Sequence, residues 1–183
     1  MIFFSGFSLQ NEEELFFDYL NDLKDNPYVV AGFSYGAIKA LEFAANSSKR
    51  IDKLILISPA WFCNKSKAFI KTQLLYYKKD VDAYTKTFLK NIAYPSNIDL
   101  IKYIAPTTLS DLEKLLTYSW PSELFKICKK RNIIIETYLG GKDKIIDAYE
   151  AHEFFRQYSE SYLFKDVGHI LRSNKDYSRT FRA

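Results

Sequence analysis

The chain has 183 residues, of which 48% are hydrophobic and 26% charged, and its formal net charge is +4. This balance predicts one globular domain with a sizeable core and excludes a disordered chain. Two cysteines, Cys63 and Cys128, favour a reduced cytoplasmic protein without a cysteine ligand cluster, and no stretch resembles a membrane span or secretory signal.

Strands and helices are expected to alternate along the chain. Strands are expected at residues 2–4, 28–31, 53–57, 132–139 and 161–164. Asn11 is the expected N-cap of a helix after the first strand, and residues 35–45 and 148–158 predict two further helices. This order of elements is typical of βαβ units and predicts a parallel sheet.

A long segment, residues 61–120, separates the third and fourth strands. It contains no glycine and shows helical periodicity in several short pieces. A structureless loop of this size is implausible inside a compact domain, so we expect a helical cap over the sheet edge. The predicted division is a core of residues 1–60 and 121–183 and an inserted cap of residues 61–120.

Glycines mark one edge of the predicted sheet. All six lie at or just after the C-terminal end of a predicted strand, where open parallel sheets form their ligand crevice: Gly6, Gly32, Gly36, Gly140, Gly141 and Gly168. Residues 32–36 (GFSYG) match the G-x-S-x-G pattern, in which the serine occupies a strained turn between strand and helix. The alternative is that Ser34 only caps the helix after a tight turn.

A nucleophilic serine needs a base and an acid that orients the base. His169 follows the last strand, whereas His152 lies in a charged helical stretch and is expected at the surface. Asp143 ends the fourth strand, and Asp147 competes with it four residues later. Asp143 is preferred as the orienting acid, because the turn after the fourth strand places it at the strand tip. The alternative for Asp143 is a helix N-cap, a role that one carboxylate cannot fully serve while it holds His169. These residues predict that Ser34 is the nucleophile.

The oxyanion of an acyl-transfer reaction needs backbone N–H donors. One expected donor is the residue after the nucleophile, Tyr35, and the other is Phe7, in the loop after the first strand.

With these residues in the order Ser, Asp, His, the chain resembles an α/β-hydrolase that lacks the first strands of the family. The resemblance implies a truncated α/β-hydrolase fold, with about five contiguous parallel strands and residues 2–4 at the edge of the sheet.

More narrowly, the chain is similar to the short BioV-type pimeloyl-[acyl-carrier protein] methyl ester esterases of biotin synthesis. The similarity rests on residues 3–7, 32–34, 36–40, 58–59, 142–145, 164–166 and 169. It implies a serine carboxylesterase that hydrolyses this methyl ester on the acyl carrier protein, without a metal or organic cofactor. Tyr35 stands where a methionine is common in the family, and the tail beyond Arg172 is longer, with no role assigned to it.

The predicted cap is basic. Residues 61–102 contain eight lysines and three aspartates, a local net charge of +5. Lys67, Lys71 and Lys78 fall within a narrow sector of one helix and are candidates for binding an acidic acyl carrier protein. A solvated lysine face is an equally good interpretation. Nucleic acid binding fits less well, because no arginine cluster or base-stacking motif accompanies the lysines.

An acyl chain also needs an apolar lining, for which Phe33 and Trp61 are candidates, although core packing is the usual role of such residues. Two alternatives stay open. The first is a small-molecule carboxylesterase or acyl thioesterase with the same triad, and the second is a non-catalytic binding protein on a hydrolase scaffold.

Overall fold

The computed structural model describes residues 1–175 of the chain. Five strands form one sheet in the order in which they occur in the chain, and every neighbouring pair is parallel. The strands are β1 (Ile2–Phe4), β2 (Val29–Phe33), β3 (Lys53–Ile57), β4 (Ile134–Gly140) and β5 (Glu160–Phe164). The predicted parallel sheet, with residues 2–4 at its edge, is therefore confirmed.

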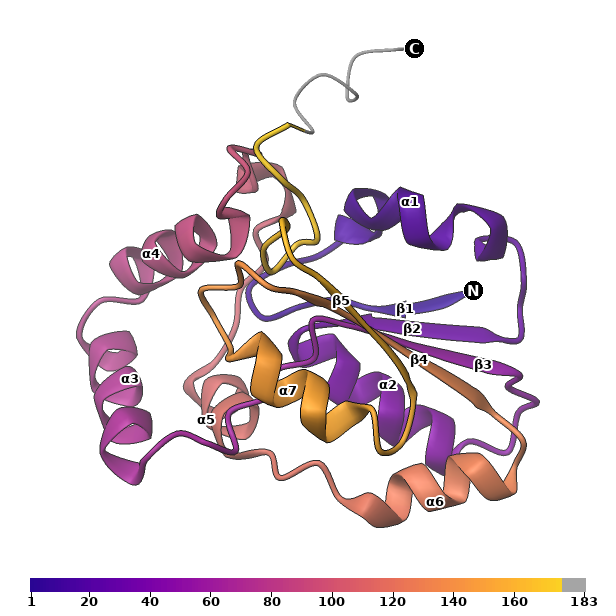
Figure 1. Ribbon diagram of the computed structural model, residues 1–183. Helices are drawn as coiled ribbons and strands as arrows, with labels where there is room; N and C mark the ends of the chain where they lie inside the picture. Colours follow the sequence, from indigo (N-terminus) through magenta and orange to yellow (C-terminus); the bar gives the residue numbers. More distant parts are fainter. Residues whose placement is uncertain (176–183) are drawn as a thin grey trace.

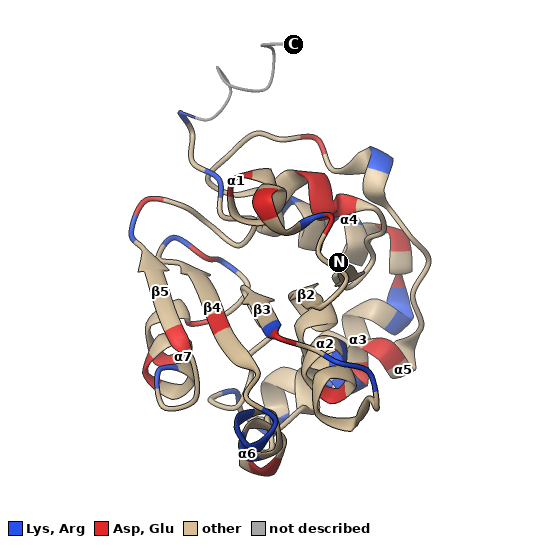
Figure 2. Cartoon of the chain, turned by 90° about the vertical axis from the view of Figure 1, so that its right-hand side faces the viewer, with Lys and Arg blue, Asp and Glu red and all other residues tan. Residues whose placement is uncertain are grey.

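Helices cover both faces of the sheet. In Figure 1, α1 (Phe17–Leu20) lies above the sheet, and α2 (Tyr35–Asn46), α6 (Ser122–Lys130) and α7 (Ala148–Phe155) lie below it. The central strands are accordingly apolar: every residue of β2 and all but the first residue of β3 are buried. Figure 2 shows β2 to β5 side by side, with α6 beneath them.

The segment after β1 differs from its prediction in two respects. It is helical, but α1 is only four residues long and is flanked by 3₁₀ turns at Glu12–Phe16 and Asn21–Leu23. Asn11 has a left-handed backbone (φ 57°) and makes no capping hydrogen bond through its side chain. An N-cap side chain reaches the first-turn N–H groups from an extended backbone, so the expectation that Asn11 caps this helix is wrong.

The segment between β3 and α6 forms the cap. It contains α3 (Lys67–Lys79), α4 (Val81–Ala93), a 3₁₀ turn at Ile101–Tyr103 and α5 (Leu109–Thr117). These helices lie beside the C-terminal ends of the strands, on the left of Figure 1, and α3 packs against both α4 and α5. The predicted helical insertion after the third strand is confirmed, whereas the exact domain boundaries at residues 60 and 121 stay a prediction.

The cap is joined to the loop that follows β1. The backbone N–H of Gln10 donates to the carbonyl of Tyr103 at 2.7 Å, and that of Ala105 donates to Ser8 at 2.9 Å. The cap segment therefore adds a short antiparallel bridge to this loop.

Two features are absent from the described range, residues 1–175. No helix in this range has the length and apolarity needed to cross a membrane. No three His, Cys, Asp or Glu side chains in it are grouped as metal ligands would be. Most of the tail beyond Arg172, to which no role was assigned, lies outside the described residues.

Candidate active site

Ser34 stands at a sharp turn between β2 and α2. Its backbone angles are φ 53° and ψ −112°, an unfavourable combination for any residue with a side chain. A Cβ on Gly32 would lie 2.3 Å from the carbonyl oxygen of Gly36, and one on Gly36 would lie 1.9 Å from that of Phe4. The two glycines of the motif thus allow α2 to pack directly against the strand ends, which fixes the strained turn at Ser34.

The turn brings the three sequence-predicted side chains together. Ser34 Oγ lies 3.0 Å from His169 Nε2, and His169 Nδ1 lies 2.5 Å from Asp143 Oδ2. Ser34 is 1% exposed, and the side chains of His169 and Asp143 are fully buried. This is the arrangement in which an imidazole can accept the serine proton while a carboxylate fixes its orientation.

The two competing aspartates have separate environments. Asp143 uses one oxygen for His169, and its Oδ1 accepts hydrogen bonds from the backbone N–H groups of Ile145 (2.6 Å) and Ile146 (3.2 Å). Asp147 is the N-cap of α7, where its Oδ1 accepts from two first-turn N–H groups. The geometry therefore favours Asp143 as the orienting acid. It also shows that one carboxylate can bind the backbone and the imidazole at once, which the sequence reasoning excluded.

Two contacts that the sequence analysis did not assign hold His169 in place. Ser58 Oγ donates a 2.6 Å hydrogen bond to the carbonyl oxygen of His169. The ring of Phe33 lies 5.1 Å from the imidazole, centroid to centroid. Ser58 follows directly after β3 and has φ 42°. In the sequence, the only sign of its contact with His169 is that it is a polar residue at the end of a strand. His152 instead lies on α7 and contacts Ser161 through Nδ1 at 2.9 Å.

The two expected oxyanion donors come from two separate segments, the start of α2 and the loop after β1. Tyr35 is the first residue of α2, where N–H groups have no acceptor within the helix. Phe7 lies in the loop between β1 and the first 3₁₀ turn, and its buried ring packs against Tyr77 of α3 and Phe88 of α4. The loop that carries this backbone N–H is therefore held directly beneath the cap helices.

Tyr35 also connects the serine turn to the cap through its side chain. Its hydroxyl donates to Asp111 Oδ1 of α5 at 3.4 Å, and the ammonium of Lys39 lies 4.4 Å from the centre of its ring. Burial, followed by the nearby Asp111 carboxylate, raises the pKa of Tyr35 to about 12. The hydroxyl is thus neutral at ordinary pH and serves as a hydrogen-bond donor.

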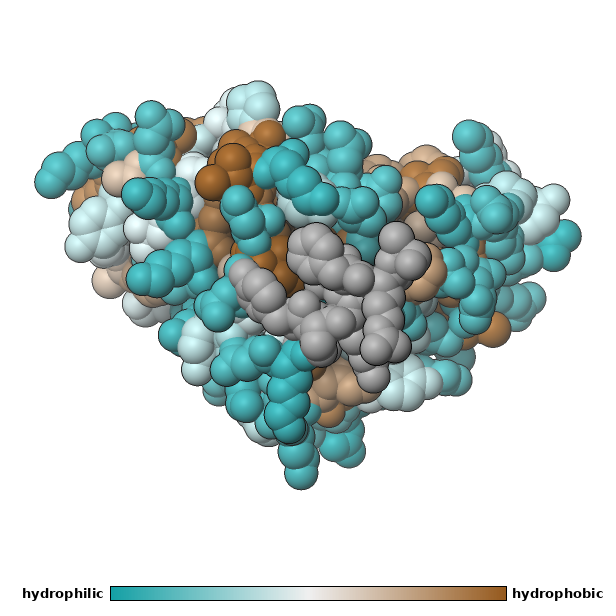
Figure 3. Space-filling view, turned by 90° about the horizontal axis from the view of Figure 1, so that it is seen from above, coloured by the Kyte–Doolittle hydropathy of each residue, from teal (hydrophilic) through white to brown (hydrophobic). Residues whose placement is uncertain are grey.

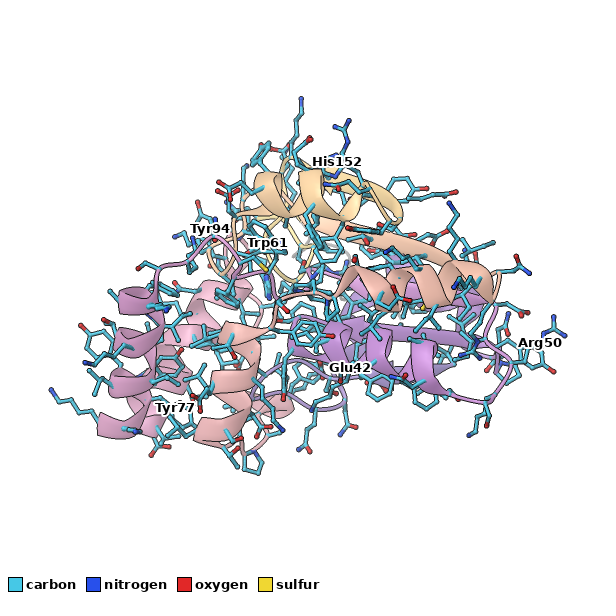
Figure 4. The ribbon with its side chains drawn as sticks, turned by 90° about the horizontal axis from the view of Figure 1, so that it is seen from below. Glu42, Arg50, Trp61, Tyr77, Tyr94 and His152 are labelled. Atoms are coloured by element: carbon cyan, nitrogen blue, oxygen red, sulfur yellow. The ribbon has the colours of Figure 1, made fainter. Side chains whose placement is uncertain are left out.

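The predicted binding residues occupy several different places. Phe33 is fully buried between His169 and Phe16. Trp61 packs against Phe154 of α7, and Figure 4 shows it between the cap, where Tyr77 lies, and the far end of the core, where Arg50 lies. Neither contact tests a role in substrate binding, so both roles stay predictions.

The three predicted lysines share one exposed helix. Lys67, Lys71 and Lys78 are all exposed on α3, and none of them forms an ion pair with another residue of the described range. The geometry leaves their charges available to a partner.

Two cavities adjoin α4. One, of about 650 Å³, lies among α3, α4 and α5 and reaches Ile145, two residues after Asp143; its lining includes Phe62, Phe88 and Leu115. The other, of about 1080 Å³, lies between α4 and residues 94–107. Figure 3 shows an apolar area among hydrophilic side chains on the upper face of the molecule.

Comparison of the sequence with known families and curated proteins identifies no relative of this chain. No protein-family model matches the chain, and no curated protein matches it in sequence.

Solved structures give a consistent fold. MenH from S. aureus is 14% identical, with a TM-score of 0.58, and the match covers 98% of this chain and 87% of MenH. BioG from Haemophilus influenzae is 12% identical (TM-score 0.56; 99% and 94% covered). Naproxen esterase, carboxylesterase NP, from Bacillus subtilis is 16% identical (TM-score 0.52; 96% and 68% covered).

The chain spans only 65% and 62% of the length of two further matched structures. Matches of this kind define the fold, and residues 1–175 have the α/β-hydrolase fold. The fold class expected from the sequence is confirmed.

Proposed function

We propose that this protein is a serine carboxylic ester hydrolase. The observation that supports this most directly is the buried series of contacts from Ser34 through His169 to Asp143, at 3.0 and 2.5 Å. The strained turn at Ser34 and the presence of carboxylesterases among proteins of the same fold support it further.

Each proposed residue has a defined step. Ser34 Oγ attacks the ester carbonyl while His169 Nε2 accepts its proton, and Asp143 stabilises the resulting imidazolium. The N–H groups of Phe7 and Tyr35 donate to the oxyanion of the tetrahedral intermediate. His169 then protonates the departing alcohol, and water activated by the same imidazole hydrolyses the acyl-enzyme.

Replacing the nucleophile tests this proposal. We expect Ser34→Ala to lower kcat for p-nitrophenyl butyrate by about 10⁴-fold or more, because no other group replaces the lost hydroxyl. Ser122→Ala, on the exposed start of α6, is the matched control and should hydrolyse at the wild-type rate. Equal rates for Ser34→Ala and wild type would contradict the nucleophile assignment.

We further propose the methyl ester of pimeloyl-acyl carrier protein as the substrate. The resemblance to the BioV-type esterases supports it, as does the free positive charge of the cap. On α3, Leu75 is 55% exposed and lies four residues after Lys71 and three before Lys78. Exposed lysines around an apolar side chain suit a partner that is acidic around an apolar patch.

Mass analysis of the carrier-bound ester tests the substrate directly. Incubation with the wild type should remove the mass of one methylene group, as methyl ester becomes free acid, and Ser34→Ala should leave the mass unchanged. Loss of the whole acyl group instead would identify a thioesterase.

Neutralising the lysines tests the partner. The variant Lys67→Gln/Lys71→Gln/Lys78→Gln should raise KM for the carrier-bound ester about tenfold, because electrostatic steering is lost. It should leave kcat/KM for p-nitrophenyl butyrate within twofold of wild type.

The control removes the same charge elsewhere. Lys126, Lys129 and Lys130 lie on α6, on the opposite side of the molecule from α3 in Figure 1, and their replacement by Gln should leave the turnover of both substrates unaffected. Equal effects of the cap variant on both substrates would favour a small-molecule esterase.

A further inference from the structure

Glu12 is a buried carboxyl group that the proposed reaction does not use. Its side chain is 0% exposed, whereas its neighbours Glu13 and Glu14 are exposed. No cationic side chain pairs with Glu12 among residues 1–175. Burial raises the pKa of Glu12. Placing an unpaired carboxyl group in the interior is costly, so a specific contact is expected to compensate for it.

That contact is with the loop that carries the first oxyanion donor. Glu12 Oε1 accepts a 2.6 Å hydrogen bond from the backbone N–H of Gly6, the residue before Phe7. The other oxygen, Oε2, is buried and has no hydrogen-bond partner in the described part of the chain. The side chain therefore reaches back across six residues to bind the Gly6 amide, and its own backbone N–H and the Ser5 side chain also favour the charged form and so oppose the rise of its pKa.

Two hydrogen bonds determine how Gly6 is oriented. The N–H of Gly6 donates to Glu12, and the carbonyl oxygen of Gly6 accepts from the N–H of Leu9 at 3.2 Å. A trans peptide is planar, so the N–H of Phe7 points away from the carbonyl of Gly6. Fixing the two polar groups of Gly6 consequently fixes the direction of the Phe7 N–H.

Gly6 also lies close to the nucleophile. A Cβ at this position would lie 2.8 Å from the ring of Phe33, the residue before Ser34. The ring of Phe7 packs against the cap helices, but the backbone hydrogen bonds between the loop and the cap begin only at Ser8. Glu12 therefore holds the backbone immediately before Phe7, at a position that no backbone hydrogen bond from the cap reaches.

We propose that Glu12 is a positioning residue, which accepts from Gly6 and thereby aims the Phe7 N–H at the oxyanion. This inference rests on the proposed ester hydrolysis. It assigns a role in the transition state to a side chain that does not touch the substrate. The acceptor oxygen is the required feature, and the negative charge is not.

Two substitutions of similar size separate these features. Glu12→Gln retains an acceptor oxygen, whereas Glu12→Met fills the same space without one, and apolar replacements of buried charged groups are commonly tolerated in folding. Glu13→Gln, at the exposed neighbouring position, is the control. For each variant we would measure the melting temperature, kcat and KM for p-nitrophenyl butyrate, and the rate at which a fluorophosphonate labels Ser34.

A displaced oxyanion donor lowers turnover more than binding. Removing such a donor outright costs about 10²–10³ in kcat, so we expect Glu12→Met to lose about 10–100-fold in kcat and in labelling rate. Its KM should stay within threefold of wild type. For Glu12→Gln, kcat and the labelling rate should stay within fivefold of the wild-type values. For Glu13→Gln, both should equal the wild-type values. Wild-type rates for a folded Glu12→Met, or equal losses in both Glu12 variants, would overturn the proposal.

The labelling measurement keeps this inference separate from the proposed function, because labelling requires only Ser34, its base and the oxyanion donors. A wild type that is labelled but cleaves no ester would overturn the proposed hydrolysis. The comparison of Glu12→Met with Glu12→Gln would then still decide whether Glu12 positions the loop.

Discussion

The core and the cap fix their side chains in different ways. In the core, the geometry at Ser34 depends on backbone packing, with Gly36 directly against the end of β1. In the cap, large apolar side chains such as Leu75 and Tyr76 are more than half exposed, and cavities of about 650 and 1080 Å³ adjoin α4. The core is therefore built for one arrangement, whereas the cap has surface and space that a substrate or partner can occupy.

The difference suggests a division of roles. Under the proposed function, the core performs the chemistry, because the side chains of the triad are buried and fixed. The cap then selects the ester, because the exposed lysines of α3 and both cavities lie there. Phe7 belongs to both regions: its N–H is the proposed donor, and its ring lies beneath α3 and α4.

The largest effect is expected from removing the acid in the core. Asp143→Asn should lower kcat by about 10⁴-fold, because the amide cannot stabilise the imidazolium or select the correct tautomer. Steady-state kinetics with p-nitrophenyl butyrate would measure it.

Asp147→Asn is the matched comparison four residues away. It changes a helix N-cap at which Asn is also favourable, so kcat and stability should stay close to wild type. A larger loss of kcat in Asp147→Asn than in Asp143→Asn would reverse the assignment of the orienting acid.

A smaller but substantial loss of stability and of kcat is expected at the contact between the cap and the loop that carries His169. A Cβ on Gly168, the residue before His169, would lie 1.7 Å from the backbone carbonyl oxygen of Tyr94 in the cap. Gly168→Ala should therefore reduce the free energy of unfolding by about 3 kcal/mol, measured by urea denaturation, and should also lower kcat.

Gly141→Ala provides the control, since its Cβ would come no closer than 3.2 Å to Lys165. We expect it to cost at most about 1 kcal/mol. If both variants were equally stable, the cap would not be pressed against the histidine loop as described.

The smallest effect is expected from the side-chain link between Tyr35 and α5. Tyr35→Phe removes the hydroxyl that binds Asp111 at 3.4 Å and keeps the backbone N–H, so kcat should stay within threefold and stability within about 1 kcal/mol. A tenfold loss of kcat would show that the cap contact helps to position the oxyanion donor.

The stability of Tyr35→Phe and of the wild type at alkaline pH gives a second test of the link between Tyr35 and α5. Because the pKa of Tyr35 is raised to about 12 in the folded protein, the unfolded chain loses this proton first as pH rises. The wild type should therefore lose stability between about pH 10 and 12, and Tyr35→Phe should lose less. Urea denaturation of both proteins over this range would measure the difference.

Local patterns were sufficient for the five strands, apart from some of their ends, and for the turn at Ser34. Residues 53–57 form the predicted strand exactly as delimited, and the glycines of residues 32–36 mark the turn at Ser34, because strand ends and tight turns depend on neighbouring residues. Asn11 shows the limit of this reasoning, since its capping role depends on a backbone conformation that its residue type does not determine.

The sequence by itself determined the alternation of strands and helices along the chain, the turn at Ser34 and the set of side chains able to form a triad, because these follow from local periodicity and turn residues. The order of the strands in the sheet was instead what the resemblance to α/β-hydrolases implied. The sequence preferred Asp143 to Asp147, but only the tertiary structure shows the contact itself, since both follow β4 and only Asp143 lies against His169 in the loop after β5. It alone also placed Ser58 beneath His169 and buried Glu12 beside Gly6. Such contacts depend on how separate segments meet in space, which no local pattern specifies.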